Sequence, residues 1–147
     1  MIRIVLYSDQ PILAKQLKVL VQTDPTLALQ ACCTNILAVK EQLAAQLPDL
    51  LVIEVTPQIT LSVLTELRRL TGECKVILWA QQMTTQFAGQ ALALGIQGIL
   101  RSTHPLELHR KCLHKVYAGE LWIEESFVAR GVTQNDKLTW GRYEPSM

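Results

Sequence analysis

The sequence predicts an α/β protein built on a doubly wound, five-stranded parallel sheet with helices on both faces. Three observations lead to this expectation. Short apolar runs alternate five times with longer amphipathic segments, which is the pattern of repeated strand–helix units. The short runs are almost continuously apolar, as strands covered on both sides are. Right-handed crossovers between parallel strands then restrict the topology to a doubly wound sheet, a three-layer sandwich.

The predicted strands are short apolar runs, rich in branched residues and bounded by turn residues. They cover residues 2–7, 27–33, 49–54, 75–80 and 98–100. In such a sheet, functional side chains collect at the carboxyl ends of the strands, near the point where the strand order reverses.

The predicted helices show apolar residues at helical spacing together with start and stop signals. Pro11 suits the first position of a helix, because its missing N–H costs nothing there. Asn35 is a cap candidate, and Gly72, Gly95 and Gly119 each follow a helical stretch. The expected helices cover residues 11–22, 35–46, 61–70, 84–94 and 105–119.

Composition and charge narrow the class of protein. The chain has 147 residues, of which 49% are apolar and 18% charged, as in a single globular domain. A formal net charge of +1 gives no strong field for nucleic acid or membrane, and no apolar run is long enough to span a bilayer. The N-terminus lacks the features of a signal peptide, which predicts a cytoplasmic protein. The cysteines have no metal-ligand spacing and are expected to be free thiols: Cys32, Cys33, Cys74 and Cys112.

The last part of the chain differs from the rest. We expect a domain over residues 1–120 and a C-terminal extension over residues 121–147, formed by a short helix or an irregular tail. Its aromatic residues can anchor a protein partner, since aromatics dominate binding hot spots, or they can pack back on the chain's own core. They are Trp122, Phe127, Trp140 and Tyr143.

Five stretches carry a likeness to a known family: IRIVLYSDQP, PDLLVIE, KVILWA, LGIQGILR and KVYAGELW. On these stretches, residues 1 to about 125 resemble the receiver domain of response regulators, the CheY-like fold, and most of all the NarL/LuxR type. The resemblance implies a bacterial signalling protein of a two-component phosphorelay and not an enzyme. In typical NarL/LuxR regulators a DNA-reading helix-turn-helix follows. Here fewer than thirty residues follow, so a stand-alone receiver without direct nucleic-acid binding is expected.

The resemblance also locates the phosphorylation chemistry and implies that it is degenerate here. Typical receivers hold Mg²⁺ with an acidic pair after the first strand, phosphorylate an aspartate after the third, and contact the phosphate through a hydroxyl and a lysine after the fourth and fifth. In this chain Ser8 and Asp9 stand at the acidic pair and Glu54 at the acceptor. Ala80 replaces the hydroxyl and Ser102 the lysine.

Two acidic residues keep alternative interpretations open. Glu54 can accept a phosphoryl group, mimic a phosphorylated aspartate, or be a plain strand-end carboxylate, solvated or paired with Arg101; the sequence favours the last. Asp9 can cap the first helix or bind a divalent cation weakly with the Glu54 carboxylate and the Thr56 carbonyl. No other cofactor is expected. The aromatic switch position of receivers is occupied by Ile99.

The histidines do not predict a metal site. His104, His109 and His114 are spaced by five residues, and five residues turn a helix by about 140°, so they do not share a face. The neighbouring basic residues are interpreted as a solvated face of the last helix.

The sequence therefore predicts a pseudo-receiver that acts through protein–protein contacts, including a homodimer. The expected surface is the fourth and fifth helices with the strand between them, with the first and fifth helices as the alternative. The rival function is a divergent regulator that is still phosphorylated or binds metal at Asp9 and Glu54. A small-molecule binder of the same architecture is disfavoured, because the stretch SDQP after the first strand cannot wrap a phosphate.

Overall fold

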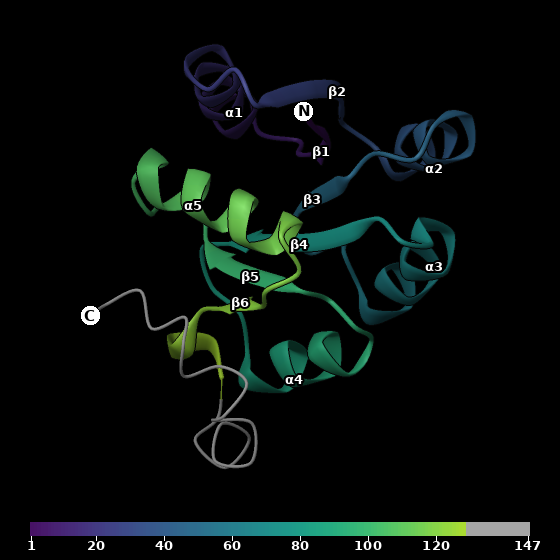
Figure 1. Cartoon of the computed structure of the whole chain (residues 1–147). Helices are drawn as coiled ribbons and strands as arrows, with labels where there is room; N and C mark the ends of the chain where they lie inside the picture. The colour runs from purple at the N-terminus through teal and green to yellow at the C-terminus, as the bar shows by residue number, and fades with distance from the viewer. Residues whose placement is uncertain (129–147) are drawn as a thin grey trace.

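The structure, a computed structural model, describes residues 1–128 as one parallel sheet with helices on both faces (Figure 1). The strand order is β2-β1-β3-β4-β5-β6. The strands are β1 (Ile2–Tyr7), β2 (Leu27–Cys33), β3 (Leu50–Glu54), β4 (Lys75–Ala80), β5 (Gly98–Arg101) and β6 (Trp122–Ile123). The helices are α1 (Pro11–Thr23), α2 (Ile36–Ala45), α3 (Leu61–Thr71), α4 (Thr85–Ala93) and α5 (Leu106–Tyr117), with a 3₁₀ turn η1 (Glu125–Phe127).

Two apolar cores lie on opposite faces of the sheet. One joins the sheet to α1 and α5, and the other joins it to α2, α3 and α4 (Figure 1). Leu17 of α1 and Leu113 of α5 are fully buried in the first core, and Val39 of α2 is fully buried in the second. The central strand β3 is buried along its whole length, as its continuous apolar sequence predicts.

The sequence signals for the ends of the elements are confirmed. Pro11 is the first residue of α1, and the Asn35 side chain accepts a hydrogen bond from the Ala38 N–H at 2.8 Å. Gly72 and Gly95 follow α3 and α4 with φ angles of 57° and 90°, a conformation that side chains rarely adopt.

The sheet contains one strand more than the five that the sequence predicts. The pair Trp122 and Ile123 forms β6, which runs parallel to the edge strand β5 opposite Gly98 and Ile99. A two-residue strand has no periodicity from which it can be recognised. The short helix expected in this stretch is only the 3₁₀ turn η1, and residues 121–128 pack on the sheet.

The strand order decides where a site can form. β1 lies between β2 and β3, so the chain crosses from one side of β1 to the other and the order reverses there. The carboxyl ends of β1 and β3 therefore lie side by side at the switch point of the sheet.

None of the described helices is long and apolar enough to cross a bilayer.

Candidate functional site

The centre of the candidate site is a hydrogen bond between the ends of β1 and β3. Tyr7 and Ile53 are partners in the pairing of these strands, so the residues that follow them, Ser8 and Glu54, meet. The Ser8 hydroxyl donates to Glu54 Oε1 at 2.7 Å and accepts from the Gln10 N–H at 3.1 Å. Ser8 and Glu54 are only 5% and 7% exposed. The hydroxyl thus ties the first loop to a buried carboxylate.

Burial raises the pKa of Glu54 above its ordinary value. The negative charge of Asp9 raises this pKa further, while the hydrogen bonds from the Ser8 hydroxyl and the Asp9 backbone N–H lower it. The net shift is upward, because a buried carboxylate loses more solvation than these donors return. Asp9 itself is exposed.

Two of the expected contacts of these carboxylates are wrong. Asp9 does not cap α1, whose cap residue is Gln10 and whose cap makes no side-chain hydrogen bond. Arg101 does not pair with Glu54. Its guanidinium donates to the Gln81 carbonyl at 2.6 Å and to Ser126 Oγ at 2.8 Å. The reason is that Arg101 ends β5 beside β6, two strands away from β3.

The expected metal ligands have other bonds in the structure. The Thr56 carbonyl accepts the Ile59 N–H at 2.9 Å, and Glu54 Oε1 accepts the Ser8 hydroxyl. Within residues 1–128, no group of three or more His, Cys, Asp or Glu side chains is placed to hold a metal ion. A site on Asp9, Glu54 and Thr56 would depend on two carboxylates and one carbonyl, fewer than the six oxygens that Mg²⁺ requires, with water supplying the rest.

The remaining positions of the site carry no cation and little polarity. Ala80 is 1% exposed, and its carbonyl accepts the Ser102 N–H at 2.9 Å. Ser102 is 5% exposed, and its carbonyl lies 3.2 Å from Nε2 of His109. Ile99 is fully buried in the apolar core. The strand ends and the residues that follow them therefore carry two hydroxyls, two carboxylates and one alanine, and a direct side-chain hydrogen bond joins Ser8 to Glu54.

The three histidines have three separate partners, as their spacing predicts. His104 Nε2 lies 2.8 Å from Glu124 Oε1. His109 is buried edge-on against Trp79, with ring centroids 4.6 Å apart. Burial lowers the pKa of His109 to about 4, so it is neutral at physiological pH. His114 lies against the loop that follows α1.

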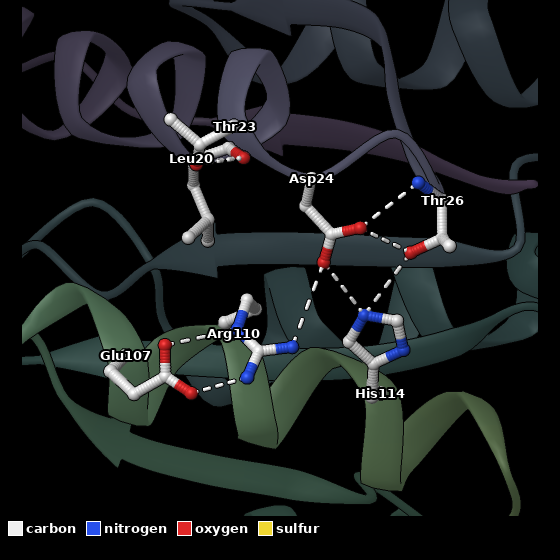
Figure 2. Close-up of polar contacts among 7 residues, drawn as sticks. All are labelled: Leu20, Thr23, Asp24, Thr26, Glu107, Arg110 and His114. Atoms are coloured by element: carbon white, nitrogen blue, oxygen red, sulfur yellow. Dashed lines mark hydrogen bonds and ion pairs between the residues drawn. The ribbon is translucent and has the colours of Figure 1, made fainter.

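That loop contains a polar cluster that the sequence did not reveal (Figure 2). Asp24 Oδ1 accepts the Thr26 N–H at 2.9 Å and the Thr26 hydroxyl at 2.5 Å. Its Oδ2 lies 2.9 Å from His114 Nε2 and 3.8 Å from an Arg110 nitrogen, and Arg110 also pairs with Glu107. The Thr26 hydroxyl and the His114 ring are the main causes that hold the pKa of Asp24 well below its usual range.

This cluster corrects the interpretation of the last helix. Arg110 and His114 were expected on a solvated face, but they connect α5 to the end of α1 (Figure 2). The contact joins residues 90 positions apart in the chain, and no local pattern marks it. It fixes the relative position of the two helices on one face of the sheet.

The tail aromatics divide into two groups. Trp122 and Phe127 are 3% and 2% exposed, and each packs in one of the two cores. For these two residues the alternative of packing on the chain's own core is confirmed, and they are not accessible to a partner. Their apolar surface is covered by the sheet and its helices. Trp140 and Tyr143 lie outside the described residues.

Comparison with known proteins supports the fold. No family model and no curated protein matches the sequence. Among solved structures, a LuxR-family two-component response regulator from Aurantimonas sp. SI85-9A1 is similar with a TM-score of 0.74 and 19% identity, over 83% of this chain and 89% of that chain. The receiver domain of the response regulator NarL from Mycobacterium tuberculosis gives 0.72 and 19%, over 81% and 98%.

A third structure is the isolated receiver domain of RcsB from Salmonella enterica serovar Typhimurium with the phosphomimetic BeF₃⁻. It gives a TM-score of 0.74 at 14% identity, over 86% of this chain and 95% of that chain. The chain thus has the fold of response-regulator receiver domains. At these identities the likeness concerns the fold, and function must be argued from the site.

Proposed function

We propose that this chain is a pseudo-receiver: a signalling module that acts through protein–protein contacts and is not switched by phosphorylation of Glu54. The observation that carries the proposal is the 2.7 Å hydrogen bond from Ser8 to Glu54. At the place where receivers hold a metal between two acids, one acid is replaced by a hydroxyl that donates to the other.

Phosphoryl transfer depends on positive charge around the transferring oxygens. In this chain Ala80 and Ser102 stand where a hydroxyl and a lysine would be. The Arg101 guanidinium donates to Gln81 and Ser126 and is not paired with Glu54.

The same features argue against Glu54 as a constant mimic of a phosphorylated aspartate. A carboxylate carries one negative charge where a phosphate carries about two. The Glu54 charge is further opposed by burial and by Asp9. We therefore treat Glu54 as a structural carboxylate that closes the site against Ser8.

The working surface in this proposal is formed by α4, β5 and α5, with the α1–α5 face as the alternative, and its ligands are proteins, including a second copy of the chain. No catalytic activity and no direct binding of nucleic acid are part of the proposal. All four cysteines are free, which fits the reducing environment of a cytoplasm.

The proposal is tested by recording amide NMR shifts while Mg²⁺ and then beryllofluoride, a phosphoryl mimic, are added. We expect no localised shifts at Asp9, Glu54 and Ser102 at millimolar ligand. The matched variant is Ser8→Asp, which restores the second acid and is expected to gain Mg²⁺-dependent shifts at these residues. Localised shifts in the unmodified chain would overturn the proposal.

A second function is favoured by one observation, the exposed carboxylate of Asp9 beside Glu54. In that function the chain is a divergent regulator that binds Mg²⁺ weakly and is phosphorylated on Glu54. Incubation with a small phosphodonor and Mg²⁺, followed by intact-mass measurement, separates the two functions. A mass increase of one phosphoryl group that Glu54→Gln abolishes would establish the second.

A further inference from the structure

Residues 121–128 form a strap that closes the outer edge of the sheet next to β5. The Trp122 N–H donates to the Gln97 carbonyl at 3.0 Å and the Glu124 N–H to the Ile99 carbonyl at 2.8 Å. Trp122 packs in the core below α1 and α5, and Phe127 in the core below α2, α3 and α4. The strap thus lies along β5 (Figure 1), and its two aromatic side chains pack in the cores on the two faces of the sheet.

One arginine connects this strap to the loop between β4 and α4. Arg101 ends β5, and its Nη1 donates to the Gln81 carbonyl at 2.6 Å while its Nη2 donates to Ser126 Oγ at 2.8 Å. The centre of the guanidinium lies 4.8 Å from the centroid of the Phe127 ring, within the range of a cation–π contact. Gln81 directly follows Ala80, one of the strand ends of the candidate site.

A second set of polar contacts, made by Glu124, fixes the same strap. Glu124 Oε1 accepts the Arg101 backbone N–H at 3.2 Å and lies 2.8 Å from His104 Nε2, and the Ser126 hydroxyl lies 3.3 Å from Glu124 Oε2. The strap therefore has a fixed position from which Ser126 can reach the arginine. A contact at one end of the guanidinium constrains the other end, because the fork is planar and rigid.

We propose that Arg101 couples the β4–α4 loop to the strap, so that a change in the position of that loop changes the docking of residues 121–128. The device is regulatory: the loop lies at the strand ends, and the strap leads into residues 129–147 of the chain. The coupling is reciprocal, as any linkage between two contacts must be. It goes beyond the proposed function and does not depend on whether Glu54 is phosphorylated.

The coupling is measured on the amide of Gln82 and the amide of Glu124. The Gln82 N–H belongs to the same peptide group as the Gln81 carbonyl, so its NMR shift reports the bond from Arg101. Hydrogen exchange of the Glu124 N–H reports docking of the strap. We expect Ser126→Ala to shift the Gln82 amide in the otherwise unmodified chain, and to leave it unchanged in an Arg101→Gln background.

Arg101→Gln itself is expected to speed hydrogen exchange of the Glu124 amide roughly tenfold, because the variant loses a charge-assisted hydrogen bond that holds the strap. Arg101→Lys is expected to resemble Arg101→Gln, because one ammonium cannot bridge both acceptors. Ser62→Ala, an exposed serine on α3, is the matched control and leaves Gln82 unchanged. An unchanged Gln82 shift in Ser126→Ala, or an Arg101→Lys variant indistinguishable from the unmodified chain, would overturn the proposal.

Discussion

Gly98, the first residue of β5, lies where β5 is held tightly between β4 and α5, and Gly98→Ala tests how closely this part of the core is packed. A Cβ at this position would lie 2.9 Å and 3.3 Å from two side-chain carbons of Ile77, and 3.2 Å from Cγ2 of Val116. Favourable carbon–carbon contacts lie at about 3.5–4.0 Å. All three contacts are too short, and both neighbours are buried at 1% exposure or less.

The expected loss follows from this overlap. Forcing an extra methyl group into a well-packed core costs about 1–3 kcal/mol of the free energy of unfolding. For a chain of this size, each kcal/mol lowers the Tm by roughly 3–4 °C. Gly98→Ala is therefore expected to lower the Tm by roughly 3–12 °C. Since Gly98 also pairs with Trp122, the strap should loosen at the same time.

The assay is urea and thermal unfolding, with Gly89→Ala as the matched control. Gly89 lies inside α4, and a Cβ there would meet nothing within 4 Å. The control is expected to gain about 0.5–1 kcal/mol, since alanine is the better helix former. If the two variants changed stability equally and in the same direction, the close packing of β5 would be refuted.

Three further predictions concern titration and reactivity. The pKa of Glu54 is raised in the folded protein, so folding favours its protonated form, and the free energy of unfolding should fall as pH rises from the ordinary pKa of 4.5 to the raised one. Urea unfolding of Glu54→Gln at a series of pH values should lack this decline. Parallel pH profiles of stability for the variant and the unmodified chain would contradict the prediction. The pKa of Asp24 is lowered in the folded protein, so the ionised Asp24 carboxylate stabilises the fold above about pH 4, and this contribution is lost as pH falls further. Asp24→Asn should be less stable than the unmodified chain at pH 7, and the difference in stability should shrink in acid. Cys32 is exposed, whereas burial raises the pKa of Cys74 to about 12. Iodoacetamide should therefore label Cys32 before Cys74, which peptide mass spectrometry would detect. Faster labelling of Cys74 would show that the α3–β4 turn opens.

Much of the fold was predictable because its signals are local. Strands β1 to β5 are continuous apolar runs, and the helices carry caps such as Asn35 and stop residues such as Gly72. The sixth strand was missed because its existence depends on the edge of β5, not on its own two residues. The burial of Trp122 and Phe127 follows from the same edge, which the sequence does not show.

The candidate site was partly predictable for a related reason. Ser8 and Glu54 are 46 residues apart, yet the alternation of strands and helices is enough to place the ends of β1 and β3 side by side. Their direct bond was not foreseen, because a sequence places residues at strand ends without showing which donor reaches which acceptor. The cluster around Asp24 lies on no strand end, so topology gave no reason to join it to His114.

The position of Arg101 shows how strand topology and side-chain contacts together decide the site. As the residue at the end of β5, it was one of the alternatives considered for Glu54, which was interpreted as either solvated or paired with Arg101. The strap offers Arg101 two other partners, Ser126 and the Phe127 ring, and the β4–α4 loop offers a third, the Gln81 carbonyl. In this position the guanidinium makes two hydrogen bonds and a cation–π contact, whereas Glu54 lies two strands away from β5. The absence of a guanidinium paired with Glu54 and the contact of Arg101 with the strap are thus two consequences of where one side chain turns.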